Sequence, residues 1–198
     1  MADGPVSYWR LGEPSGTAGS DQLGINRGSY LGGLILGQPG AVAGNTAVRM
    51  NGSSGRISVP DSASLRTGDT FTVEMWVKLG KLGVSQGLAS KGFVLYLDAK
   101  GYLKIRKPNV ADIATSSVRI ADTSAYHHIA VTKSGKTTKM YIDGADRTGL
   151  VDERTLGDSN TALLMGTGAG YLNGTLDDVA LYRRALTSAE VSKHYKAR

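Results

Sequence analysis

The sequence predicts an all-β fold, a sandwich or barrel of short strands with one helix at the C-terminal end. Of its 198 residues 27 are glycine, about twice the average usage, and these glycines lack the strict period of a collagen. They separate short runs rich in Val, Ile, Thr and Tyr, which is the pattern of an antiparallel β protein. Only the C-terminal end shows the 3.6-residue period of a helix over more than about ten residues.

The composition is that of an ordinary folded domain, and we expect one domain over residues 1–198. Apolar residues make up 40% of the chain and charged residues 20%, which is sufficient for a hydrophobic core. No apolar run approaches the roughly 18 residues of a transmembrane helix, so membrane insertion is not expected. The N-terminus lacks the charged and apolar regions of a secretion signal, and Met1 to Gly4 is typical of the start of an excised or internal domain.

The charge and the absence of cysteine limit the chemistry. With no cysteine, the chain has neither disulfides nor thiolate metal sites. The net charge of +6 favours anionic partners or serves solubility alone, and the sequence leaves both open. Around Tyr102, the basic residues Lys100, Lys104, Arg106 and Lys107 are more typical of a charge-protected edge strand than of a nucleic-acid surface. Nucleic acid is therefore not expected as a partner.

The strands follow one another from the N-terminus with glycine-rich turns between them. The helix is predicted by Thr187 and Glu190, which form a capping box, and it should run to about Lys196 and close one end of the sandwich. The expected strands cover residues 6–10, 30–36, 46–50, 56–59, 70–78, 93–98, 102–107, 118–120 and 171–182, with a hairpin at 127–143.

The hairpin is the most informative of these elements. A two-residue turn at Ser134-Gly135 would pair Ile129 with Met140 and His128 with Tyr141. Since strand side chains alternate between faces, one face should be apolar and the other polar with aromatic rings. The expected core face holds Ile129, Val131, Met140 and Ile142, and the opposite face holds His128, Thr132, Lys139 and Tyr141.

The strand at 70–78 alternates in the same way and places Trp76 on the face away from the core, beside Glu74. One interpretation is that sheet curvature or an overlying loop buries Trp76. The other is that the indole is a flat platform on a concave sheet, suited to the C–H face of a sugar ring.

Four stretches resemble the laminin G-like, concanavalin A-like jelly-roll modules common in bacterial and phage surface proteins. They are PVSYWRLGE at 5–13, FTVEMWV at 71–77, HIAVT at 128–132 with YIDG at 141–144, and GTLDDV at 174–179. The opening also resembles modules of phage tail proteins. The resemblance implies a two-sheet antiparallel jelly-roll sandwich, and it leaves function open because this fold carries lectins, adhesive modules, hydrolases and structural domains.

The same resemblance implies a calcium ion between an early loop and the late acidic strand. The matching positions are Asp21 and either Asp177 or Asp178. Asp177 is the first choice, because it faces the core if Val179 does, and a buried carboxylate needs a partner. The alternative is that backbone amides or a basic residue such as Arg10 supply that partner.

Catalysis is not expected. Jelly-roll glycanases carry two carboxylates on alternate outward positions of one strand, whereas the comparable positions here are Glu74, Trp76 and Lys78, of which one is acidic. The three histidines also lack the spacing of a transition-metal site.

We therefore predict a non-catalytic binding or adhesion module of a larger extracellular or phage tail protein, located outside the cell or on a virion surface, that recognises cell-surface carbohydrate. The alternative is a structural or assembly domain without a small ligand, which could oligomerise through its parent assembly; a glycan hydrolase or lyase is a remote third option. The candidate ligand-binding residues are Glu74, Trp76, Tyr96, His128, Lys139 and Tyr141.

Overall fold

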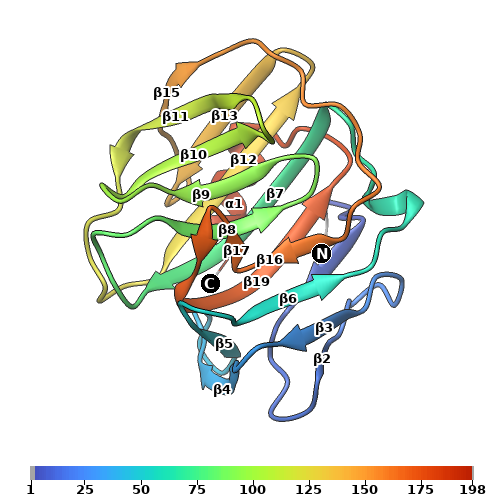
Figure 1. The fold of residues 1–198 in the computed structure, drawn as a ribbon, viewed down its shortest axis with the longest axis vertical. Helices are drawn as coiled ribbons and strands as arrows, with labels where there is room; N and C mark the ends of the chain where they lie inside the picture. Colours follow the sequence, from blue (N-terminus) through green and yellow to red (C-terminus); the bar gives the residue numbers. More distant parts are fainter. Residues whose placement is uncertain (1–2, 198) are drawn as a thin grey trace.

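A computed structural model describes residues 3–197 of the chain and shows two antiparallel sheets lying face to face (Figure 1). In Figure 1 the nine-stranded sheet B lies in front of the eight-stranded sheet A. The order of sheet A is β14 (Ala145–Asp146), β13 (Thr137–Ile142), β12 (His127–Ser134), β7 (Thr70–Leu79), β19 (Asn173–Tyr182), β5 (Thr46–Asn51) and β4 (Ile35–Pro39), with β1 (Ser7–Trp9) pairing with the last part of β19.

Sheet B confirms the predicted two-sheet antiparallel sandwich. A small hairpin, β17 (Thr167–Gly168) and β18 (Gly170–Tyr171), stands beside it, and one turn of 3-10 helix covers Ala63–Leu65. The order of sheet B is β15 (Thr148–Val151), β11 (Ala111–Arg119), β10 (Tyr102–Lys107), β9 (Val94–Leu97), β8 (Gln86–Ser90), β16 (Leu163–Met165), β6 (Arg56–Val59), β3 (Gly28–Leu31) and β2 (Ala18–Gly19).

The hydrophobic core lies between the sheets and follows the predicted alternation. On β7 the side chains of Phe71, Val73, Met75 and Val77 are buried in it. Trp9 of β1 is also fully buried there, and its indole nitrogen donates a hydrogen bond to the Asn26 carbonyl. The period-2 pattern of the strongest strand therefore identifies the inner face correctly.

The predicted register of the long hairpin is wrong by two residues. The turn is Gly135-Lys136, so that Ser134 pairs with Thr137 and Ile129 with Ile142. Gly135 has a φ of 55°. A two-residue turn with glycine as its first residue matches the twist of the flanking strands. This explains why Gly135 is the first residue of the turn and not, as predicted, the second. Because the error is an even number of residues, the predicted core and outer faces are preserved.

Glycines also explain why the single strand predicted at residues 30–36 is in fact parts of two strands. Residues 30–36 form parts of β3 in sheet B and β4 in sheet A. Between them Gly32 and Gly33 have φ values of 74° and 73°, and the chain crosses from one sheet to the other. A Cβ at Gly32 would lie 2.2 Å from the Ser54 carbonyl oxygen, so only glycine fits at this crossing. The basic strand β10 is likewise not an edge strand, since β9 and β11 flank it.

Helix α1 (Ser188–Lys196) begins at the predicted capping box, in which Thr187 and Glu190 bond reciprocally. Its position differs from the prediction. It does not close one end of the sandwich but packs on the outer face of sheet A, where Val191 and Leu186 form a second apolar cluster with Ala130, Tyr141, Ala180 and Tyr182. Within residues 3–197 no helix is long and apolar enough to cross a membrane.

Candidate functional site

Trp76 lies on the outer face of sheet A, as predicted, but it is not an open platform. Its side chain is 5% exposed. The indole packs against the His128 ring, with centroids 5.0 Å apart, and against Tyr195 of helix α1 at 5.7 Å. Tyr141, on the same face, is 1% exposed. Of the two interpretations, the structure shows the one in which the chain folds over Trp76, and the segment that does so is helix α1.

Beside the covered indole, a pocket of about 290 Å³ remains between helix α1 and sheet A. We call it the α1 pocket. Three of the predicted ligand-binding residues come together in it, namely Glu74, Trp76 and His128. The other lining residues, which the sequence reading did not select as ligand contacts, include Asp3, Tyr8, Val42, Asp178, Tyr182, Lys193 and His194.

Glu74 is the centre of the hydrogen-bond network in this pocket. The Tyr182 hydroxyl donates to its Oε1 at 2.8 Å, and His194 Nδ1 lies 3.0 Å from both carboxylate oxygens. His128 Nε2 is 3.6 Å from Oε2. Burial alone would raise the pKa of Glu74, but the close imidazole of His128 and the hydrogen bonds with His194 outweigh it and lower the pKa to about 2.

His194 connects this carboxylate to a second one. Its Nε2 lies 2.9 Å from Asp3 Oδ2, so the imidazole stands between two acids. The hydrogen bond with Glu74 raises the pKa of His194 to about 9 against the effect of burial, and Asp3 adds to it. The positive charge of His194 thus ties the last turns of α1 to the middle of sheet A at neutral pH.

One polar atom of the α1 pocket lacks a partner. His128 is 2% exposed, and its Nδ1 is buried without any hydrogen bond; within the described residues only Thr138 Oγ1 shares this condition. A buried polar atom without a partner is costly. Because Nδ1 of His128 has almost no accessible surface, it is not presented to a ligand in the pocket.

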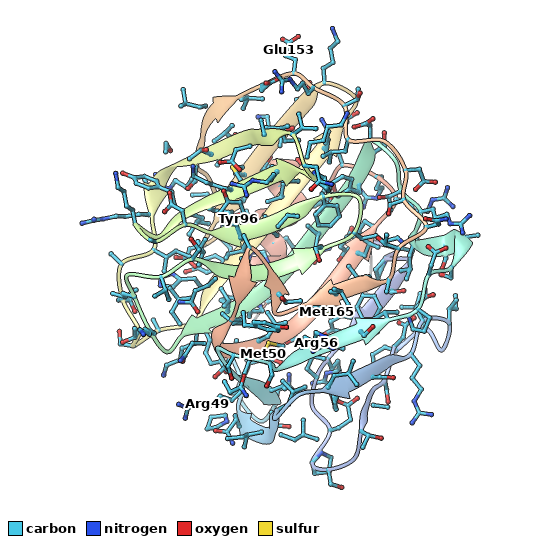
Figure 2. All side chains as sticks on the ribbon, viewed as in Figure 1. Arg49, Met50, Arg56, Tyr96, Glu153 and Met165 are labelled. Atoms are coloured by element: carbon cyan, nitrogen blue, oxygen red, sulfur yellow. The ribbon has the colours of Figure 1, made fainter. Side chains whose placement is uncertain are left out.

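Tyr96 and Lys139, two of the predicted contacts, lie elsewhere. Tyr96 is on β9 of sheet B (Figure 2), where its hydroxyl donates to Asp112 Oδ1 at 2.8 Å and the guanidinium of Arg106 covers its ring. Lys139 is half exposed and pairs with Asp146 near the edge of sheet A. The strand assignment of Tyr96 was right, but strand alternation does not reveal which sheet a strand joins.

Asp177 does not face the core, contrary to the prediction. β19 has a register shift between Asp177 and Ala180, and Asp178 in the shift has a φ of 47°. The bulge inverts the alternation, so Leu176 and Val179 both enter the core while Asp177 does not. Asp177 is nevertheless fully buried and accepts hydrogen bonds from the Ala41 amide at 2.8 Å and from Asn45 Nδ2 at 3.2 Å.

The predicted calcium residues do not assemble a metal-binding group by themselves. Asp21 accepts hydrogen bonds from the backbone amides of Tyr8, Leu23 and Asn26, which occupy both of its oxygens. Asp178 accepts one from the Tyr8 hydroxyl. Within residues 3–197 no three His, Asp or Glu side chains are placed to hold one ion, whereas calcium takes six to eight oxygens. Calcium binding stays a prediction.

Asparagine in place of Asp177 is expected to stabilise the protein at alkaline pH. Burial and the neighbouring Asp178 raise the pKa of Asp177 to about 7 from 3.8. The folded state therefore binds the extra proton, and stability falls as pH rises from 3.8 through 7. In a calcium-free buffer, D177N should exceed the wild type by about 1–2 kcal/mol at pH 8 and match it near pH 4, measured by urea unfolding.

The exposed Asp158→Asn serves as the control for this substitution, since it should change stability at neither pH. A D177N protein that is less stable than the wild type at pH 8 would contradict the destabilising effect of burial and of the Asp178 charge on Asp177. Repeating the measurement with added calcium tests the predicted ion, because an ion held by Asp177 would stabilise the wild type and not D177N.

Comparisons with known proteins agree with this architecture. The family model for the concanavalin A-like lectin/glucanases superfamily matches residues 51–192. No curated protein sequence matches the chain. Among solved structures, the chain resembles the binding domain of Paraclostridial Mosquitocidal Protein 1, with 19% identity and a TM-score of 0.74 over 98% of this chain and 52% of that one.

Two further solved structures are similar. One is domain 4 of AbnA, an extracellular arabinanase from Geobacillus stearothermophilus, in complex with arabinotriose, with 19% identity, a TM-score of 0.64, and coverage of 93% and 84%. The other is Trypanosoma rangeli sialidase, with 15% identity, a TM-score of 0.70, and coverage of 96% of this chain and 32% of that one. These likenesses show the fold, and the family model shows the family: the chain belongs to the concanavalin A-like lectin/glucanase superfamily.

Proposed function

We propose that this protein is a non-catalytic carbohydrate-binding module that holds one sugar ring of a cell-surface glycan in the α1 pocket. The observation that carries the proposal is a pocket in which aromatic side chains stand beside charged groups that can bond sugar hydroxyls. Tyr8 and Trp76 line the pocket with apolar surface for the ring, while Glu74, Asp178 and Lys193 line it with hydrogen-bonding groups.

The size of the α1 pocket supports a single ring. At about 290 Å³ it lies at the lower end of the range for small-molecule sites, so it suits a terminal or branch sugar better than the interior of a chain. The ammonium of Lys193 is largely exposed at the pocket, with its side chain 64% accessible, and can donate to a further hydroxyl. With so few contacts we expect modest affinity.

The similar structures support a module within a longer protein. This chain spans about half of the binding-domain chain of the mosquitocidal protein and about a third of the sialidase chain. The structure of the arabinanase domain contains arabinotriose. By analogy we propose that this chain belongs to an extracellular or phage tail protein and recognises glycan there, with an assembly role as the alternative.

A second candidate is glycoside hydrolysis, which one observation favours. Of the three carboxylates that line the α1 pocket, Glu74 and Asp178 have opposite shifts, since the pKa of Glu74 is lowered while burial raises that of Asp178. Such a difference is how glycosidases divide the roles of acid and nucleophile. We place catalysis second, because Glu74 already bonds Tyr182 and His194 and Asp178 already bonds Tyr8. If the protein released reducing ends from a panel of glycans, hydrolysis would become the first candidate function and binding the second.

Filling the α1 pocket should abolish glycan binding without unfolding the protein. Val42 lines the pocket from a partly exposed loop position, so tryptophan there would occupy the space for the sugar. On a glycan array that retains the wild type, we expect Val42→Trp to lose at least about tenfold in affinity. The matched control is Ala43→Trp, an exposed neighbour outside the pocket lining, which should bind as the wild type does.

Two results would contradict the proposal. One is a Val42→Trp protein that binds its glycan undiminished, which would place the site elsewhere. The other is a wild type that binds no glycan on the array and forms a defined oligomer by light scattering, which would favour the assembly role.

A further inference from the structure

Two neighbouring hollows lie away from the α1 pocket, one beside the loop after β7 and one on sheet B. The first, of about 380 Å³, is bounded by the loop after β7, the turn between β9 and β10, and the end of β11. The second, of about 390 Å³, lies over β10 and β11. Both are lined by Asp98 and Lys100, so the two hollows adjoin at these residues, and we call them together the basic groove.

The charges that line the basic groove are mainly positive. Its cations are Lys81, Lys100, Lys104 and Arg119, and Asp98 is its one acidic lining residue. Lys104 is neutralised by Asp112 at 3.1 Å and Asp98 at 3.8 Å. The side chains of Lys81, Lys100 and Arg119 are exposed and have no ion pair among the residues that the structure describes. Three uncompensated charges around one depression attract an anion.

The rest of the lining suits a ring with both apolar and hydroxyl surfaces. Leu82 and Val84 are 43% and 38% exposed at the first hollow and give it an apolar side. In the second hollow, Tyr102 and the hydroxyls of Thr115 and Ser117 stand beside the exposed Leu150. This mixture of apolar contacts and hydrogen-bonding groups matches sugars.

We infer that the basic groove binds an acidic oligosaccharide, a chain of sugars that carries carboxylate or sulfate groups. Each hollow has the volume for one ring, and Lys100 lines both of them, so this cation would lie beside each of two bound rings. A nucleic-acid strand fits less well, because its bases need exposed aromatic faces and Tyr102 is the one aromatic lining residue. The inference does not depend on the α1 pocket, which lies on sheet A.

The test compares two triple variants that have the same net charge. Their ligands are two oligosaccharides that have the same sugar backbone and differ only in charge. The groove variant carries Lys81→Gln, Lys100→Gln and Arg119→Gln. The control carries Lys136→Gln, Lys139→Gln and Arg154→Gln, whose side chains are at least half exposed and lie outside the basic groove. Binding to oligogalacturonate, and to its uncharged methyl ester, is measured by calorimetry.

We expect the wild type and the control to bind oligogalacturonate and the groove variant to bind about tenfold more weakly or not at all. The methyl ester should not bind, and the wild-type affinity should fall as salt is added. Equal weakening in both triple variants would overturn the inference, because net charge alone would then explain it. Tighter binding of oligothymidylate than of oligogalacturonate, lost in the groove variant, would overturn it in favour of nucleic acid. Val42 does not line the basic groove. The Val42→Trp variant should therefore bind oligogalacturonate even if the α1 pocket binds no sugar.

Discussion

Aspartate in place of Val191 is expected to release helix α1 from sheet A. Val191 is the one fully buried side chain of this helix, and it packs with Leu186, Tyr141 and Tyr182. A carboxylate at this position would be buried without a partner, so the helix should detach, at a cost of about 3–4 kcal/mol in the free energy of unfolding. Detachment should also uncover Trp76, and its fluorescence should shift to the red.

The fluorescence readout is specific, because the second tryptophan, Trp9, is fully buried in the core between the sheets and should stay there. The control is Ala189→Asp, which adds the same carboxylate to an exposed position in the first turn of α1, where negative charge is favourable. A Val191→Asp protein with unchanged emission and stability would contradict the prediction, because it would show that the attachment of the helix does not depend on this contact.

The prediction from sequence was best where one physical rule governs a segment. The alternation of Phe71, Val73, Met75 and Val77 identifies the inner face of β7, since only one face of the strand can enter the core. The capping box identifies the start of α1 because its bonds join residues three apart in the chain. Both rules act locally, so neither needs the rest of the fold.

The errors arose where distant segments decide the outcome. Nothing near Trp76 in the chain indicates that Tyr195, more than a hundred residues later, covers it. The bulge at Asp178 depends on β19 pairing with β7 on one side and with β1 and β5 on the other, and it turned Asp177 away from the core. Tertiary packing brings His194 and Tyr8 into the lining of the α1 pocket, and a single sequence does not show which distant residues pack together. The one usable signal was the capped helix itself, whose apolar side had to cover some part of the sandwich.

Alanine in place of Glu74 is expected to have an equally large effect, for an electrostatic reason. The carboxylate is 5% exposed and is bonded by Tyr182 and His194. Removing one partner of a buried ion pair leaves the other charge uncompensated, so we expect a loss of about 3–5 kcal/mol in chemical denaturation. Glu153→Ala, which removes a carboxylate with 77% side-chain exposure, should cost almost nothing.

The pH profile separates this electrostatic effect from a simple loss of packing. In the wild type the pKa of His194 is raised to about 9, so its contribution is complete below pH 6.5 and is lost as pH rises through 9. The pKa of Glu74 is lowered to about 2, so its contribution is present above pH 4.5 and is lost as pH falls through 2. Glu74→Ala should therefore flatten the decline of the melting temperature between pH 6.5 and 9, with Asp3 preserving part of it. If the alkaline decline were as steep in Glu74→Ala as in the wild type, His194 would not be held by Glu74, and the attachment of α1 to sheet A would have to rest on its apolar contacts alone.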